Sequence, residues 1–144
     1  MKSLKVTLFF LIITFFTNSI AAACDEEKIH DEIKEILQLA IDLPLLQQFF
    51  HNRTPLTIEE SDYVHSDYIK GLKSAGKTVQ FMSKNDIRKN NIKHYLTILT
   101  WDVSSFGINA EFEYKVEGII ISYEFKKDYS TLKWNVENST IIEH

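Results

Sequence analysis

Two carboxylates and an imidazole come close together in the segment Asp62-x-x-His65-x-Asp67. Metal sites are built from such residues, yet this spacing matches no established ligand signature such as H-E-x-x-H. A polar surface loop accounts for the same residues. The other histidines are scattered, and His30 falls within a predicted helix. We therefore expect neither a metal nor a cofactor.

A second pair of acids, Glu111 and Glu124, is predicted to meet across a hairpin on the polar face of a sheet. Like charges directly opposite each other destabilise a hairpin by up to ~1 kcal/mol. Lys115 and Lys126 would offset this in an ordinary charged lattice, and the alternative is a site for a cation or a basic partner. Catalytic carboxylate pairs need a sheltered pocket that separates their pKa values, which a solvated strand face does not supply.

Nucleophile and phosphate-binding motifs are absent from the sequence. No serine, cysteine or lysine stands in a recognisable nucleophile setting, and the G-x-S-x-G, P-loop and dinucleotide glycine patterns are missing. The chain has only 4 glycines to supply such patterns. We therefore expect a protein that is not an enzyme.

Aromatic side chains are predicted to form a band on the buried face of the same sheet. Core packing explains such a band, but a curved sheet with a helix across it can also leave an apolar pocket. Tyrosine hydroxyls inside that pocket would orient a ligand. The pocket residues would be Tyr114, Tyr123 and Trp134, with a small apolar molecule as the ligand.

The first 23 residues are predicted to be a signal peptide. Lys2 and Lys5 precede an apolar run over 6–16, and small residues follow at 21–23. This order of basic, apolar and small residues is typical of a secretory signal. A run of 11 residues is short for a permanent anchor, which needs ~20. An uncleaved anchor helix is the alternative.

Cys24 is the only cysteine and stands at the expected cleavage position. Ala21–Ala23 suits ordinary signal peptidase, which would leave a free N-terminal thiol. The stretch 20–24 also resembles a relaxed bacterial lipobox, although Ala21 replaces the usual leucine. An exported protein with an exposed unpaired thiol risks oxidation, so we expect lipidation at Cys24 and a membrane as a partner. Several acyl chains would hold the domain firmly on a bilayer.

Composition places the rest of the chain among folded domains. The 144 residues are 44% hydrophobic and 12% aromatic, which excludes a disordered tail. Without residues 1–23 the chain loses two lysines and no acid, so 14 basic and 20 acidic residues leave a net charge of −6. An acidic chain argues against nucleic-acid binding. We expect a single domain over 24–144.

Helical periodicity comes first along this domain. Apolar residues recur at steps of three and four over Ile29–Ile41, and Pro44 suits the first turn of a second helix. Residues 56–77 are ambiguous. Leu56 and Ile58 alternate as in a short strand, whereas Thr57-x-x-Glu60 fits a capping box and a helical pattern follows as far as Gly76. We favour a short strand followed by irregular or helical structure.

Strand periodicity then takes over. A strand is expected at Thr78–Met82, a cap at Ser83-x-x-Asp86 and a strand at Tyr95–Val103. Residues 108–116 alternate with period two, and a two-residue turn at Glu117–Gly118 would pair Tyr114 with Ile121. A turn at 127–130 would pair Tyr123 with Trp134. The sequence predicts an α+β fold, with N-terminal amphipathic helices packed on an antiparallel meander of about four to six strands.

The closing segments F-x-Y-x-V-E-G-I-I-I-S-Y-E-F-K-K and L-K-W-N-V resemble those of small exported domains of nuclear transport factor 2-like or cystatin-like shape. The resemblance covers about 92–136. It implies a cone-shaped sheet, and such families include ligand-binding modules, a few enzymes and toxin-neutralising immunity proteins. No catalytic residue carries over, because no site motif matches.

These observations predict an exported, non-enzymatic binding domain in the cell envelope or at the outer surface, anchored through Cys24, with an unknown protein or small apolar molecule as its partner. Without lipidation, the protein would be secreted or periplasmic. One alternative is an immunity-type inhibitor of an envelope toxin, since a basic toxin would suit the acidic surface. The other is a small pocket enzyme of nuclear transport factor 2-like shape.

Overall fold

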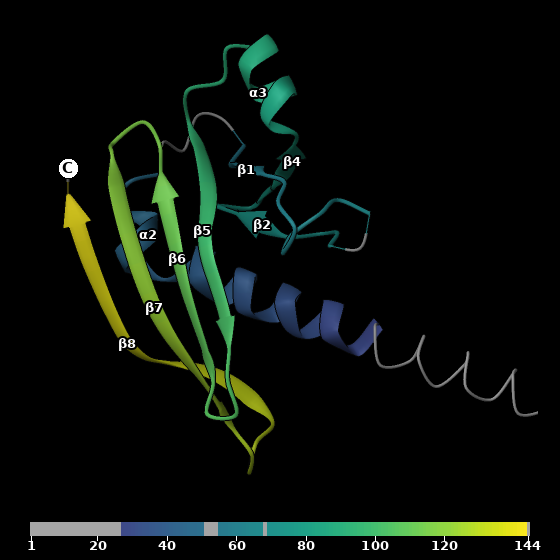
Figure 1. Ribbon diagram of the computed structural model, residues 1–144, viewed down its shortest axis with the longest axis vertical. Helices are drawn as coiled ribbons and strands as arrows, with labels where there is room; N and C mark the ends of the chain where they lie inside the picture. The colour runs from purple at the N-terminus through teal and green to yellow at the C-terminus, as the bar shows by residue number, and fades with distance from the viewer. Residues whose placement is uncertain (1–26, 51–54, 68, 144) are drawn as a thin grey trace, which may run out of the picture. The chain divides into compact units, whose positions relative to one another are not determined.

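The computed structural model describes residues 27–50, 55–67 and 69–143. Residues 33–144 form one compact unit, and 1–32 form another. The larger unit is mixed α+β (Figure 1). Its elements are α2 (Pro44–Gln47), β1 (Thr57–Glu59), β2 (Lys73–Ser74), β3 (Lys77–Thr78), β4 (Gln80–Met82), α3 (Lys84–Lys89), β5 (Tyr95–Val103), β6 (Ile108–Tyr114), β7 (Ile119–Asp128) and β8 (Lys133–Glu143).

The strands β5 to β8 form the predicted antiparallel meander, which runs through the centre of Figure 1. Strand β5 spans the residues that were predicted for it, Tyr95–Val103. Inward and outward residues alternate along β6 and β7, as the period of two requires. The assignment of side chains to the buried and the polar face is therefore confirmed for these two strands.

The predicted register of the first hairpin is wrong by two residues. Tyr114 pairs with Ile119 and not with Ile121, because the turn holds four residues, 115–118, where two were expected. Gly118 accommodates this turn with φ of +64°. A shift by two leaves every side chain on its predicted face, so the alternation could not distinguish the two registers.

The second hairpin differs from the prediction by more. Trp134 pairs with Lys127, where Tyr123 was expected, because the turn lies at 129–132 and the strands are longer. An irregularity between Glu124 and Phe125 shifts the pairing again, so that Tyr123 lies opposite Ser139. The bulge lets a long β8 follow β7 while the inward residues of β7 stay buried.

The prediction of a purely antiparallel sheet is wrong. Its order is β4-β1-β5-β6-β7-β8, and β1 runs parallel to both of its neighbours. The strand interpretation of Leu56 and Ile58 is confirmed by β1, and the capping-box alternative there is wrong. The helix alternative ending at Gly76 is also wrong. Ala75 and Gly76, with φ of +48° and +77°, instead form the two-residue turn between β2 and β3.

Short helices begin where the sequence signals them. Ser83 caps α3, because its side-chain oxygen accepts a hydrogen bond from the backbone nitrogen of Asp86. Pro44 stands at the start of α2. Residues 27–42 are helical, and those from 33 onward belong to the larger unit.

One core holds this unit together. Ile36, Leu37, Ala40 and Ile41 share a buried cluster with the inward residues of β5, β6 and β7. The largest fully buried side chains of the sheet are Phe112, Tyr114 and Phe125. Burying a side chain of this kind stabilises the fold by ~1.5–3 kcal/mol. The sheet's other face carries the polar residues of β6 and β7.

Candidate functional site

The outer face of the meander carries two rows of polar residues, which the strand register brings side by side. The first row crosses the four strands from Asp102 through Asn109 and Glu124 to Asn138. The second row crosses from Thr100 through Glu111 and Ser122 to Thr140. These eight residues line a hollow of about 350 Å³. We call it the outer-face hollow.

Internal hydrogen bonds and ion pairs fix part of the outer-face hollow. The hydroxyl of Ser122 donates to Oε1 of Glu111 at 3.1 Å. The ammonium of Lys126 lies 3.7 Å from Oε1 of Glu124 and also pairs with Glu137. The hydrogen bond with Glu137, and to a smaller extent the charges of Glu137 and Glu124, raise the pKa of Lys126 above its ordinary value.

The predicted contact between Glu111 and Glu124 is wrong. In the observed register Glu111 lies opposite Ser122, and Glu124 lies opposite Asn109. The register shift of two residues thus replaces a repulsive carboxylate pair by two pairs that can form hydrogen bonds. Lys126 lies near Glu124, as expected, whereas Lys115 pairs with Glu113.

The groups of the outer-face hollow are mainly hydrogen-bond acceptors. Asp102 is exposed and makes no ion pair with another described residue. Carboxylate, amide and hydroxyl oxygens together suit an ammonium, guanidinium or other donor-rich group. The hollow can therefore bind cationic groups.

A second hollow, of about 590 Å³, has the opposite charge. Arg88 of α3 lines it, together with Lys93, which follows α3, and Lys115, in the turn between β6 and β7. Apolar side chains complete its wall, among them Ile87, Ile92 and Val116. Lys115 pairs with Glu113, so Arg88 and Lys93 supply the positive charge there.

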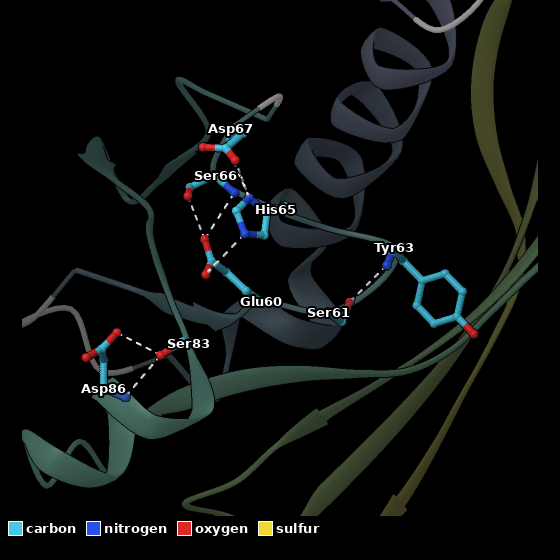
Figure 2. A network of polar contacts seen from close by, with 8 residues as sticks. All are labelled: Glu60, Ser61, Tyr63, His65, Ser66, Asp67, Ser83 and Asp86. Carbon is cyan, nitrogen blue, oxygen red and sulfur yellow. Dashed lines mark hydrogen bonds and ion pairs between the residues drawn. The ribbon is translucent and has the colours of Figure 1, made fainter.

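The segment after β1 forms the polar network shown in Figure 2. Glu60 accepts hydrogen bonds from the hydroxyl and the backbone nitrogen of Ser66, at 2.6 and 3.2 Å. Nε2 of His65 lies 3.7 Å from the Glu60 carboxylate. The pKa of Glu60 is therefore below its ordinary value, first because of the Ser66 hydroxyl and further because of His65.

Within the segment Asp62-x-x-His65-x-Asp67, His65 also contacts Asp67. Nδ1 of His65 is 3.3 Å from the Asp67 carboxylate and accepts from the Asp67 backbone nitrogen at the same distance. Among the described residues, no group of His, Cys, Asp and Glu side chains could hold a metal ion. Asp62 takes no part in the drawn network, and Glu60, which the sequence motif did not include, takes the central position (Figure 2).

The predicted pocket residues occupy different environments. Tyr114 and Tyr123 are each 2% exposed and lie in the core. Trp134 is half-buried on β8, with the ammonium of Lys127 5.4 Å from the centre of its ring. Burial raises the pKa of Tyr123, and neither its hydroxyl nor Nε1 of Trp134 has a hydrogen-bond partner among the described residues. The apolar pocket itself stays a prediction.

The predicted signal peptide and Cys24 lie outside the described residues. Within the described part of the chain, no helix combines the length and the apolar character needed to cross a bilayer. Export and lipidation at Cys24 are therefore predictions from the sequence alone.

No protein-family model, no curated protein and no solved structure matches this chain. The resemblance to nuclear transport factor 2-like or cystatin-like domains stays a prediction.

Proposed function

We propose that this chain is an exported, non-enzymatic binding domain, held at a membrane through a lipidated Cys24, which takes its partner in the outer-face hollow. The order of residues in 1–24 supports export and lipidation. In this proposal the N-terminal amphipathic helices cover the inner face of the sheet. The outer face is then the one that meets the partner.

The composition of the outer-face hollow carries the binding part of this proposal. Its side chains come from four consecutive hydrogen-bonded strands, so their spacing is set by the sheet and not by a loop. Sites built on regular elements hold their groups more accurately than sites on loops do. Three of the groups are carboxylates, those of Asp102, Glu111 and Glu124.

A basic protein is the partner that these carboxylates favour. Complementary charge speeds association and selects among partners. An immunity-type inhibitor that binds a basic toxin in the envelope is one form of this function. The enzyme alternative calls for a carboxyl group whose pKa is raised by burial. The pKa of Glu60 is lowered, chiefly by the hydroxyl of Ser66, and the pKa of Asp128 is lowered, chiefly by the hydroxyl of Ser130.

The anchoring part is tested by the intact mass of the protein from its native membrane and soluble fractions. A mass that equals residues 24–144 plus acyl chains supports it. An unmodified chain that begins at Cys24 or Asp25 in the soluble fraction contradicts lipidation. That outcome leaves the binding part standing, because the outer-face hollow lies far along the chain from Cys24.

The binding part is tested by titrating the isotope-labelled protein with a short peptide rich in arginine and lysine. We expect the side-chain amides of Asn109 and Asn138 to shift and saturate. The amide of Asn90 serves as the control, because it donates to the backbone of α3 at 2.9 Å and lies outside the hollow. Equal shifts at all three amides would mean unspecific charge attraction and would contradict the proposal.

A matched pair of variants sharpens this test. Glu111→Gln removes a charge from the hollow but keeps an oxygen that can accept from Ser122. Because a hydrogen bond to a charged group contributes ~1.5–3 kcal/mol, we expect about tenfold weaker binding. Glu143→Gln removes an equal charge at the end of β8, outside the hollow, and should leave the affinity unchanged.

A further inference from the structure

Four large apolar side chains are exposed at one end of the meander. Val103, at the end of β5, is 71% exposed, and Phe106, in the turn between β5 and β6, is 82% exposed. Tyr129 and Leu132, in the turn between β7 and β8, are 77% and 67% exposed. Both turns lie at the lower end of the sheet in Figure 1. We call these four residues the hairpin-tip surface.

The two turns are held close together. Gly107, at the end of the first turn, packs so tightly on β7 that an added Cβ would lie 2.1 Å from the carbonyl oxygen of Phe125 and 3.4 Å from Cγ of Lys126. Strand β7 ends at Asp128, two residues after Lys126, and the second turn begins there. Single exposed apolar residues are common on protein surfaces, but a group of four on adjacent turns marks an interaction site.

Hydrogen bonds keep both turns in shape while their apolar side chains face water. In the first turn, the Ser104 hydroxyl oxygen accepts from the backbone nitrogens of Phe106 and Gly107, each at 3.2 Å. In the second, Asp128 accepts from the backbone nitrogen of Ser130 at 2.8 Å and from the hydroxyls of Ser130 and Thr131. The apolar side chains are therefore displayed by ordered turns.

Leu132 adds an observation of a different kind. Its φ of +59° is in the left-handed region, which favours glycine or asparagine. A leucine there is both strained and 67% exposed, so it serves neither the turn nor the core. Such strain in a displayed side chain points to function.

The charge around the second turn indicates what the surface meets. The chain as a whole has a net charge of −4, but residues 126–133 hold three lysines and one acid, Asp128. Lys126 pairs with Glu124 and Glu137, whereas Lys133 is exposed at the end of the turn. A lysine next to aromatic and aliphatic residues in the sequence suits an anionic bilayer, where tyrosine favours the interface and lysine the headgroups.

From this geometry and charge we infer that the hairpin-tip surface docks on an anionic lipid bilayer, with Phe106 and Leu132 entering the acyl region and Lys133 at the headgroups. A narrow pair of projecting turns fits a soft surface better than it fits the flat, well-packed interface of a protein partner. This contact goes beyond the proposed function, because it needs neither the lipid on Cys24 nor the outer-face hollow.

The test measures the depth of single added tryptophans by quenching with brominated lipids. Phe106→Trp and Tyr129→Trp each place a tryptophan on one turn, and Tyr63→Trp, at a site 41% exposed between β1 and β2, is the matched control. Each variant of the full chain is bound to vesicles of phosphatidylcholine with phosphatidylglycerol. Wild-type emission, from Trp101 and Trp134, is subtracted.

We expect the emission added at 106 and 129 to be mostly lost in brominated vesicles, and the emission added at 63 to be retained. The N-terminal part is the same in every variant, so failure of the lipidation proposal does not alter this comparison. No quenching at 106 or 129 overturns the inference. A blue shift at both positions that grows with protein concentration without vesicles would indicate a second copy as the partner and also overturns it.

The role of charge is tested separately. Lys133→Glu should weaken binding to anionic vesicles about tenfold, since it replaces an attractive charge near the surface by a repulsive one. Lys70→Glu makes the same change at an exposed site outside both turns and should have little effect. Equal losses for the two variants would overturn the assignment of the surface to residues 126–133.

Discussion

The close approach of Gly107 to β7 leads to a quantitative prediction. Gly107→Ala would place a Cβ 2.1 Å from the carbonyl oxygen of Phe125 and 3.2 Å from its carbonyl carbon. Real Cβ atoms essentially never lie within 3.0 Å of another heavy atom, so one backbone segment must move by about 1 Å. The obstacle is backbone and cannot rotate away, as the end of a flexible side chain could.

The expected loss of stability is therefore near the upper end of the usual range for overpacking, about 3 kcal/mol. For a unit of this size, 1 kcal/mol corresponds to about 4 °C, so Tm should fall by roughly 10 °C. Thermal and urea unfolding, followed by circular dichroism, measure both quantities. The far-ultraviolet spectrum of the folded variant should match that of the wild type.

Gly76→Ala is the control for this experiment. Gly76 also has a positive φ, +77°, but an added Cβ would meet nothing within 4 Å. Only the left-handed backbone conformation then costs free energy, roughly 1 kcal/mol. If Gly107→Ala destabilises the protein no more than Gly76→Ala does, the tight packing of the first turn on β7 is refuted.

Three further predictions concern single side chains. The folded-state pKa of Glu60 is below its ordinary value near 4.5, so the Glu60 carboxylate contributes stability above pH 4.5, and this contribution is lost as pH falls through the folded-state pKa. Glu60→Gln should therefore lower the free energy of unfolding near neutral pH. A difference from the wild type that stayed constant down to low pH would contradict this. Leu132→Gly should raise the free energy of unfolding in urea by up to ~1 kcal/mol, because glycine relieves the backbone strain at φ of +59°. The same variant should bind vesicles more weakly. A destabilised variant would argue against strain at this position. Tyr123→Phe removes a buried hydroxyl that has no hydrogen-bond partner among the described residues. Urea unfolding should therefore show no loss of stability, or a gain of about 1 kcal/mol. A clear loss would reveal a partner for that hydroxyl.

The sequence was most informative where structure is local. The period of two located β6, and the alternation in β6 and β7 assigned their faces, because alternate residues of a strand face opposite sides. It could not fix the pairing, since a shift by two residues leaves every face unchanged. Only the turn decides between such registers, and here the turn after Tyr114 is longer than its Glu117–Gly118 signal indicated.

Non-local pairing was less accessible. Leu56 and Ile58 indicated a strand, but nothing near them in the sequence shows that β1 runs parallel to β4 and β5. The outer-face hollow was missed for the same reason. Glu111 and Glu124 were recognised on the polar face, whereas Asp102 and Asn138 join them only through the register of four strands. Glu60 was overlooked because its partner Ser66 lies outside any known motif.

The position of β1 between β4 and β5 implies an order of folding. Within the meander, each strand from β5 to β8 pairs with the next strand in the sequence, so each hairpin closes a short loop. Strand β1 pairs with β4 and β5, which follow it by more than twenty residues. Its pairing therefore closes longer loops than the hairpins do, and longer loops cost more entropy to close. We therefore expect the meander to form in the folding transition state and β1 to join after it. Substitutions in β1 should then speed unfolding and leave the folding rate almost unchanged.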